Sequence, residues 1–302
     1  MMQRRHFLRN SIFTTGGLLI GKETLLAAFR QQSPFTINML TKEMGTFTEK
    51  GGTILFLLGK DGIVTVDAQF PEQSQHLIDE LKKKSQQPFR MLINTHHHFD
   101  HTAGNISYKG LTEHVLAHQN SLNNQKTVAI AQKTEDKQLY PDKTYTDTWC
   151  DTVVSGEKIC LYYYGPGHTN GDSLVHFEHR NIVHMGDLVF NRRHPFVDRS
   201  AGASISNWVK VLDKAMNKFD RKTTYVFGHA GEGYQVTGNK DDLMAFQTYL
   251  SNVLTYTSAQ IKAGKTKEEI LKSNGIPGSP EWKGDGIERP LGAAYDELTT
   301  TM

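Results

Sequence analysis

Six residues that directly follow an apolar run carry the strongest chemical pattern in the sequence. The segment His96–His101 reads HHHFDH. In an extended segment, residues i and i+2 point the same way, so His96 and His98 can bind one metal ion. A turn after them would let Asp100 and His101 face a second ion. Imidazole nitrogens and carboxylate oxygens are suitable zinc ligands, and catalytic zinc keeps one position open for water. The alternative is a polar surface loop.

Three later residues of the same ligand types also follow strand-like runs. His168 lies in the motif GHTNGD, and Asp187 and His229 each follow a glycine. A lone histidine at such a place is usually structural, so the order and context of the three residues carry the argument.

Strands and helices that would position these residues are indicated by hydrophobic periodicity. Residue groups on loops at strand ends, held by a rigid sheet, are a common way to build a site. The pattern predicts one domain that follows an N-terminal leader. The expected strands are 36–40, 52–58, 63–66, 89–94, 158–164, 173–177, 181–185 and 224–227, and the expected helices are 71–84, 206–219, 241–261 and 267–273.

Composition excludes some classes of function. The chain has 302 residues, a net charge of +2 and 37% hydrophobic residues, which suffices for a globular core. No basic stripe stands out, so nucleic acid is not expected as a partner. No apolar run of about 20 residues follows the N-terminus, so no membrane span is expected. The sequence has 14 histidines, and most lie between His96 and His229, which again favours a metal site.

The N-terminal segment predicts export. Arg4 and Arg5 precede Phe7 and Leu8 in a twin-arginine pattern, and a short, weakly apolar stretch follows. We expect residues 1–32 to be a signal or leader segment, residues 33–302 to be the folded domain, and the protein to be periplasmic or secreted. A basic amphipathic helix is the alternative, and Ala27-Ala28 is a candidate cleavage site.

The two cysteines leave two interpretations open. Cys150 and Cys160 lie on neighbouring strand-like runs and could form a disulfide in an oxidising compartment. The favoured interpretation is that both are small buried apolar residues that do not pair. Their spacing fits no zinc site.

The complete set of motifs resembles the metallo-β-lactamase superfamily. The pattern is His-x-His-x-Asp-His, then Gly-His-Thr-x-Gly-Asp, then Gly-Asp, then Gly-His, and it covers nearly all of the chain after the leader. The resemblance implies an α/β (α+β) fold, a four-layer αββα sandwich with metal ions at one edge between the two sheets.

The resemblance also implies a ligand set for two metal ions. We expect two Zn²⁺ per chain, with iron or manganese as alternatives. The first ion would be bound by His96, His98 and His168, the second by Asp100, His101 and His229, and Asp187 would bridge both.

Other residues are expected to support the ligands or to contact substrate. Asp67 matches an early aspartate of the family and would orient ligands, as would His97 and Asp172; a simple turn residue is the alternative for Asp67. The candidate substrate contacts are Asn170, Asn191 and Arg192. Arg192 or its neighbour Arg193 could hold a substrate carboxylate, and a solvated basic loop is the alternative.

A mechanism follows from this ligand set. Two close Zn²⁺ ions lower the pKa of a shared water, and the resulting metal-bridging hydroxide would attack a carbonyl that the metals polarise. Asp100 would orient this nucleophile as the catalytic residue. No separate serine or cysteine nucleophile is needed. Because all five ligand histidines must be neutral to bind, activity should fall at acidic pH.

Asp187 narrows the class of hydrolase. True β-lactamases have Cys or Ser there, whereas a bridging aspartate resembles the thioesterase (glyoxalase II), lactonase and general hydrolase branches. We expect a small-molecule substrate with an ester, lactone, thioester or cyclic amide such as a β-lactam. The alternatives are a β-lactamase proper, a mononuclear-iron enzyme like the persulfide dioxygenases, and a non-catalytic binding protein. The oligomeric state is left open.

Overall fold

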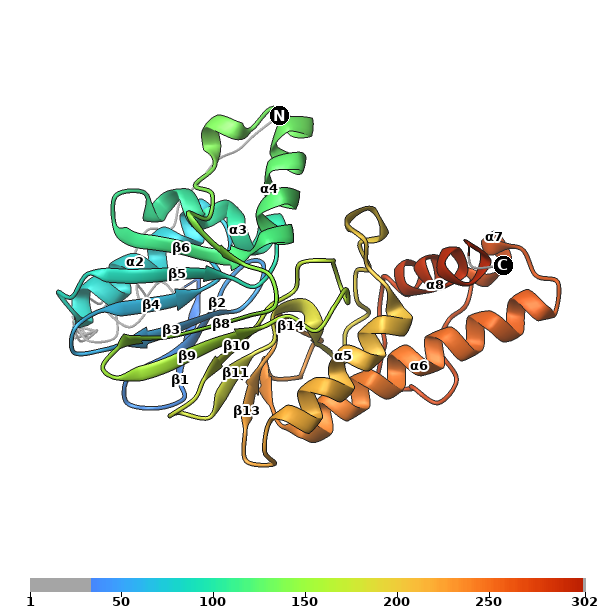
Figure 1. The fold of residues 1–302 in the computed structure, drawn as a ribbon. Coiled ribbons are helices and arrows are strands. Elements are labelled where there is room, and N and C mark those ends of the chain that lie inside the picture. Colours follow the sequence, from blue (N-terminus) through green and yellow to red (C-terminus); the bar gives the residue numbers. More distant parts are fainter. Residues whose placement is uncertain (1–33, 301–302) are drawn as a thin grey trace, which may run out of the picture. The chain divides into compact units, whose positions relative to one another are not determined.

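Two mixed β-sheets pack against each other in the computed structural model, which describes residues 34–300 (Figure 1). Apolar side chains from both sheets, such as Leu57 and Ile93 from one and Leu161 and Val175 from the other, form one buried cluster between them. This internal layer fixes the distance and orientation of the two sheets, and therefore of the loops at their edge.

The first sheet has seven strands whose order in space follows the sequence. The first four strands pair antiparallel, and the remaining pairs are parallel. The strands are β1 (Thr36–Met39), β2 (Met44–Thr48), β3 (Ile54–Leu58), β4 (Ile63–Val66), β5 (Phe89–Asn94), β6 (Thr112–His118) and β7 (Lys143–Tyr145).

The second sheet has six strands, and its order is β15-β13-β11-β10-β9-β8. Only β11 and β13 pair in parallel. A separate two-stranded ladder joins β12 (Phe190–Asn191) to β14 (His229–Ala230). The strands of the second sheet are β8 (Thr148–Val154), β9 (Glu157–Tyr162), β10 (Leu174–Phe177), β11 (Ile182–His184), β13 (Thr224–Val226) and β15 (Thr237–Gly238).

Helices cover the outer face of each sheet. On the first sheet, Leu77, Ile78 and Leu81 of α2 bury one apolar face. On the second, α5, α6 and α8 form a larger cluster around Trp208. The helices are α2 (Pro71–Lys84), α3 (Phe99–Thr102), α4 (Gln119–Gln132), α5 (Ile205–Lys218), α6 (Lys240–Lys262), α7 (Lys267–Ile270) and α8 (Glu288–Thr300), and the 3₁₀ turns are η1 (Ala103–Tyr108), η2 (Glu135–Lys137), η3 (Gly186–Leu188) and η4 (Arg199–Ala201).

The four layers confirm the predicted αββα sandwich. The predicted strand at 89–94 and the predicted helix at 71–84 have the observed bounds. The sequence pattern did not indicate β2, β6, α4 or α8. No helix within residues 34–300 is long and apolar enough to cross a membrane. The predicted leader, with its twin arginines and candidate cleavage site, lies outside the described residues.

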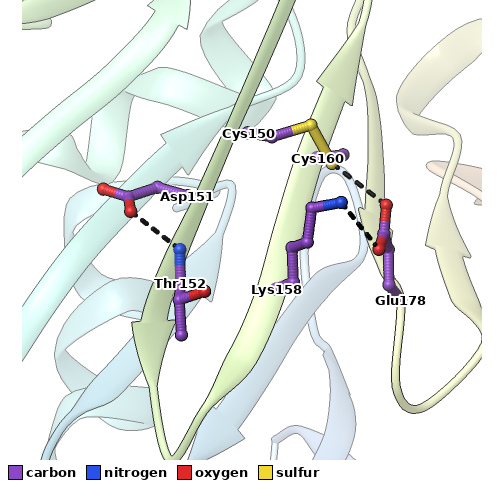
Figure 2. Close-up of a disulfide and its surroundings, with 6 residues drawn as sticks. All are labelled: Cys150, Asp151, Thr152, Lys158, Cys160 and Glu178. Atoms are coloured by element: carbon purple, nitrogen blue, oxygen red, sulfur yellow. Dashed lines mark hydrogen bonds and ion pairs between the residues drawn. A yellow bond between two sulfur atoms is a disulfide. The ribbon is translucent and has the colours of Figure 1, made fainter.

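The two cysteines form a disulfide that links β8 to β9 (Figure 2). Cys150 and Cys160 are direct partners in the antiparallel register, and their Cα atoms are 4.2 Å apart. The favoured prediction of two unpaired buried residues is therefore wrong. Cys160 is fully buried, but Cys150 is exposed on β8, an edge strand of the second sheet. The disulfide ties this edge strand to the sheet interior.

Candidate metal centre

Parallel strand ends gather the predicted ligands in one place. In the first sheet, β4 and β5 are parallel, and His96 to His101 follow β5 directly. In the second sheet, β11 and β13 are parallel, and they are followed by Asp187 on η3 and His229 on β14. His168 comes from the loop between β9 and β10. The site therefore draws side chains from both sheets.

Three histidines form the first ligand group. His96 Nε2 lies 3.1 Å from His98 Nδ1, and His168 Nε2 lies 2.8 Å from the same His98 atom. Asp187 Oδ2 lies 3.5 Å from His168 Nε2 and 4.0 Å from His96 Nε2. Around a tetrahedral zinc with bonds of about 2.0–2.1 Å, ligand atoms are about 3.3 Å apart. The four distances, from 2.8 to 4.0 Å, lie on either side of that spacing.

The second group contains Asp100, His101 and His229. His229 Nε2 lies 3.1 Å from Asp100 Oδ2, and His101 Nε2 lies 3.7 Å from it. Asp187 reaches this group as well: its Oδ1 is 3.1 Å from His101 Nε2 and its Oδ2 is 3.4 Å from His229 Nε2. Asp187 is therefore close to both groups.

Hydrogen bonds at the opposite ring nitrogen fix the tautomer of four ligand histidines. His98 Nε2 donates to Asp198 Oδ2 at 2.9 Å, and His168 Nδ1 donates to the Phe196 carbonyl at 2.8 Å. His101 Nδ1 donates to Asp67 Oδ2 at 2.8 Å. His96 Nδ1 lies 3.0 Å from the hydroxyl of Thr95, which itself donates to Asp67. In each case a proton on that nitrogen leaves the inward nitrogen with a free lone pair.

The fifth histidine has a different neighbour. His229 Nδ1 faces the guanidinium of Arg193 at 3.5 Å. Since a guanidinium cannot accept a hydrogen bond, it does not orient His229 as the oxygen atoms orient the other four rings.

Burial and charge set the protonation of the cluster. Burial and the neighbouring His101 lower the pKa of His96, and burial and His98 lower the pKa of His168 to about 3, which keeps both rings neutral. Burial would raise the pKa of Asp187, but His229 and His101 outweigh it and hold that pKa well below its usual value. Asp187 and Asp100 in turn raise the pKa of His101 and His229 against the effect of burial, so a metal cation would bind these two rings by displacing a proton.

Two glycines give the ligands the space they occupy. A Cβ atom at Gly52 would lie 2.0 Å from His101 Cε1, and a Cβ atom at Gly228 would lie 2.0 Å from Asp187 Oδ1. His101 Nε2 and Asp187 Oδ1 are both buried without a hydrogen-bond partner. Unpaired buried polar atoms need an explanation, and a metal ion between them supplies one. The donor set, the spacing and the tautomers of His96, His98, His101 and His168 fit zinc.

The residues expected to support the ligands lie around them. Asp67 is fully buried and accepts hydrogen bonds from the Thr95 backbone and hydroxyl as well as from His101. Asp172 accepts from the backbone and hydroxyl of Thr169, which fixes the loop that carries His168.

A second carboxylate, which the sequence analysis did not single out, lies behind the first group. Asp198 contacts both His98 Nε2 and His97 Nε2, the latter at 3.5 Å, and also accepts from Ser200 and the Ala201 backbone. His97 belongs to neither of the two ligand groups and lines a separate small cavity. No sequence spacing indicates Asp198, because its contact with His98 spans 100 residues.

A cavity of about 300 Å³ opens over the ligands. Two exposed aromatic residues, Phe99 and Phe196, line this cavity. Arg193, His194 and Arg289 complete a polar wall beside the ligands. Arg193 was expected only as an alternative to Arg192, and neither His194 nor Arg289 was expected at the site.

The three candidate substrate contacts are engaged elsewhere and do not line this cavity. Asn170 binds Asn124 and Asn120 of α4. Asn191 is buried and donates to the Gln235 carbonyl. Arg192 forms ion pairs with Asp242 and Glu281. Arg193 borders both the metal cavity and a neighbouring cavity of about 800 Å³.

A family comparison identifies the chain. The model of the Metallo-beta-lactamase superfamily matches residues 49–229, more than half of the sequence and all seven ligand positions. The chain belongs to the metallo-β-lactamase superfamily. It is therefore a superfamily hydrolase, and its His/Asp groups are consistent with a zinc site.

Individual superfamily members are distant in sequence. Metallo-beta-lactamase IND-1 of Chryseobacterium indologenes is 26% identical over 194 residues, which are 62% of this chain and 76% of that protein. Hydroxyacylglutathione hydrolase of Maricaulis maris is 31% identical over 98 residues, 32% of each chain. The structure of a metallo-beta-lactamase from Pontibacter korlensis aligns with a TM-score of 0.61 at 19% identity, covering 72% of this chain and 99% of that one, which shows the shared fold.

Proposed function

We propose that this protein is a dinuclear zinc hydrolase that cleaves an ester, lactone, thioester or cyclic amide of a small-molecule substrate. One observation carries the proposal: seven ligand residues form two groups, and the carboxylate of Asp187 lies within 4.0 Å of ring nitrogens in both. A mononuclear iron enzyme would need only the first group.

Different residues would position the metal ligands and the attacking water molecule. Bound zinc would supply Lewis acidity to polarise a carbonyl and lower the pKa of a water. The Asp100 side chain is 31% exposed, whereas that of Asp187 is 4% exposed. Asp100 is therefore the carboxylate that can orient a water molecule in the cavity. Thr95 and Asp67 hold His96 and His101 in position while this occurs.

The cavity wall favours a substrate with an apolar part and a negative charge. Phe99 and Phe196 offer exposed aromatic surface at the cavity. Arg193 has no carboxylate partner among residues 34–300, so its guanidinium is available for a substrate carboxylate. Arg192 is not available, because Asp242 and Glu281 already neutralise it.

Two relatives point to the candidate substrates. Hydroxyacylglutathione hydrolase is named for a thioester, and the bridging Asp187 favours that branch. Metallo-β-lactamases match over a longer part of the chain, which makes β-lactam hydrolysis the second candidate.

A hydrolysis screen of the zinc-loaded protein across thioesters, lactones, β-lactams and phosphoesters tests the proposal. We expect about two zinc per chain by metal analysis and turnover of at least one carbonyl class. His98→Ala should lose metal and nearly all turnover. His114→Ala is the matched control, because His114 pairs with Asp142 on the surface away from the site. Full turnover by His98→Ala, or about one iron per chain, would refute the assignment.

We further propose that the chain is exported to the periplasm or secreted. The disulfide supports this location, since a disulfide such as Cys150–Cys160, with Cys150 exposed, persists in an oxidising compartment. Replacing Arg4 and Arg5 with lysine should leave the protein inside the cell with both cysteines reduced. Cell fractionation and thiol alkylation followed by mass spectrometry measure the two effects. An unchanged location would exclude twin-arginine export.

A further inference from the structure

A buried tyrosine contacts the one histidine in the metal cavity wall that belongs to neither ligand group. Tyr249 lies on α6 and is fully buried. Its phenol oxygen is 2.7 Å from His194 Nδ1, and within residues 34–300 it contacts no other hydrogen-bonding group. This contact makes the phenol the natural orienting group for His194.

The tyrosine ring is held firmly in place. It stacks on Trp282 with ring centroids 4.6 Å apart and on Phe246 at 6.0 Å. Arg192 fixes Trp282 in turn: its guanidinium lies 5.3 Å from the indole ring and pairs with Glu281 and Asp242. Arg192 thus connects the segment around Trp282 to α6, which explains why it is not free to bind a substrate.

The direction of the Tyr249 hydrogen bond follows from its isolation. A buried hydroxyl proton without an acceptor costs about 1–3 kcal/mol, and among residues 34–300 His194 is the single acceptor within reach. The phenol therefore donates and His194 Nδ1 accepts. A neutral imidazole that accepts at Nδ1 carries its proton on Nε2. Burial lowers the pKa of His194, against the opposing charge of Glu288, which keeps the ring neutral.

His194 lines the same cavity as the ligands His98, Asp100, Asp187 and His229, and it also borders an adjoining cavity of about 580 Å³. It is 4% exposed, and no group within residues 34–300 hydrogen-bonds to its Nε2. A preorganised donor in a buried cavity beside a reacting carbonyl stabilises the oxygen on which negative charge develops.

We infer that His194 is a neutral Nε2–H donor that binds a substrate oxygen in the cavity over the metal ligands, and that Tyr249 is the positioning residue that fixes its tautomer. The ligand is an oxygen acceptor, either the carbonyl oxygen or the oxygen of a leaving group. The substrate part rests on the proposed hydrolase function, whereas the tautomer of His194 does not.

Nuclear magnetic resonance tests the tautomer without any substrate. In zinc-loaded protein labelled with ¹⁵N-histidine, two-bond proton–nitrogen correlations distinguish the three ring states, and His194→Gln identifies the signal. We expect neutral His194 with its proton on Nε2 at pH 7. In Tyr249→Phe, a population protonated at Nδ1 should appear. A wild-type ring that is protonated at Nδ1, or that is charged, would overturn the inference.

Kinetics test the donor role on whichever substrate the screen identifies. His194→Leu should lower kcat by about 10- to 100-fold with little change in KM or zinc content. His194→Gln, which keeps an N–H donor, should recover part of the loss, and Tyr249→Phe should lower kcat about 3- to 10-fold. Tyr225→Phe is the matched control, because Tyr225 is another fully buried phenol, on β13, that lines none of these cavities.

The two arms separate the possible failures. If no substrate is turned over, the hydrolase proposal fails, and the ring state of His194 is still measured. If the expected tautomer is found but His194→Leu keeps kcat within twofold of the wild type, His194 is not a donor to substrate.

Discussion

At the scale of single residues, the oxygen atoms that accept hydrogen bonds from the outer ring nitrogens of the ligand histidines fix the orientation of these rings. His98 is the sharpest case, because it uses Nδ1 toward the first group and leaves Nε2 to Asp198. Rotation of this ring would remove a nitrogen from the group. The carboxylate also keeps the proton away from Nδ1, so Asp198 acts on both geometry and protonation.

Replacing Asp198 with asparagine should lower zinc affinity at the first group about 10- to 100-fold. An amide can still hydrogen-bond the ring, but it lacks the negative charge that favours a proton on Nε2. Competition with a chromophoric chelator measures the affinity. Asp142→Asn is the control, since Asp142 pairs with a surface histidine, His114. Equal affinities in the two variants would mean that Asp198 does not support the metal group.

The residues of the two His/Asp groups were predictable from sequence, but those of the cavity wall were not. The spacing His-x-His-x-Asp-His is local, so the backbone alone dictates which side chains share a face. Arg192 and Arg193 are adjacent and of the same type, and their roles differ because Asp242 and Glu281, far along the chain, pair with only one of them. Such contacts depend on how the loops fold over α6.

At the scale of elements, the disulfide restrains an edge strand whose surface is largely exposed. Most residues of β8 are exposed, and only Val154 is buried. The strand therefore contributes little apolar burial of its own. The disulfide to Cys160 holds it on the sheet instead. A cross-link of 10 residues' separation removes about 2–3 kcal/mol of loop-closure entropy from the unfolded chain.

The variant with Cys150→Ser and Cys160→Ala should lose about 2–3 kcal/mol of unfolding free energy. Urea denaturation with and without reductant measures this. Reductant should destabilise the wild type by a similar amount and leave the variant unchanged. If the reductant leaves the unfolding free energy of the wild type unchanged, although both thiols are shown to be free, the disulfide does not stabilise the fold.

A carboxylate on α8 caps the start of α5. Glu297 accepts hydrogen bonds from the backbone amides of Ile205 and Ser206, at 2.8 and 3.0 Å, and from the Ser204 hydroxyl at 3.0 Å. A negative charge at a helix N-terminus is favourable. Burial would raise the pKa of Glu297, but the hydrogen bonds from Ser206, Ile205 and Ser204 outweigh it and lower the pKa below 4.5.

Glu297→Gln should lower the unfolding free energy by about 2 kcal/mol at pH 7, since charge-assisted hydrogen bonds are lost. Because the folded-state pKa is lowered, the stabilisation is present above pH 4.5 and is lost as pH falls through the folded-state pKa. The difference between wild type and variant should therefore shrink in acid. Denaturation curves from pH 3 to 7 test this, and a difference that grows in acid would contradict it.

Element prediction succeeded where apolar patterning is regular and failed where it is not. Pro71 begins α2, and Leu77, Ile78 and Leu81 mark its buried face. In contrast, the buried residues of α4 are Ser121, Gln125 and Ala129, and apolar Ile130 is 63% exposed, so no apolar stripe marks that helix. The polar face of α4 is instead held by hydrogen bonds that only the folded chain provides.

At the scale of the whole folded unit, the metal centre joins the two sheets. His96 to His101 belong to the first sheet's edge and Asp187 and His229 to the second's. Bound metal therefore stabilises the packing of one half against the other. Without metal, the charged carboxylates and imidazoles must be buried with fewer partners.

Zinc removal should lower the melting temperature by about 10 °C. Free zinc at 1,000 times its dissociation constant adds about 4 kcal/mol to the free energy of unfolding. In a protein of this size, the melting temperature shifts by about 2–4 °C per kcal/mol. Differential scanning calorimetry with chelator, and then with zinc restored, measures the effect. His98→Ala should show a smaller difference between the two states. An identical melting temperature with and without zinc would mean that the centre does not couple the sheets.

The family match ends at His229, the last ligand in the chain. Tyr249, Trp282, Lys283 and Arg289, which orient or line the cavities, all lie beyond it. Mutation and selection can therefore alter the C-terminal 73 residues without changing a ligand. Replacement of this segment during evolution would change the substrate preference and leave the metal-dependent reaction unchanged. A chimaera that keeps residues up to 229 and takes another member's C-terminal segment would carry over that member's preference.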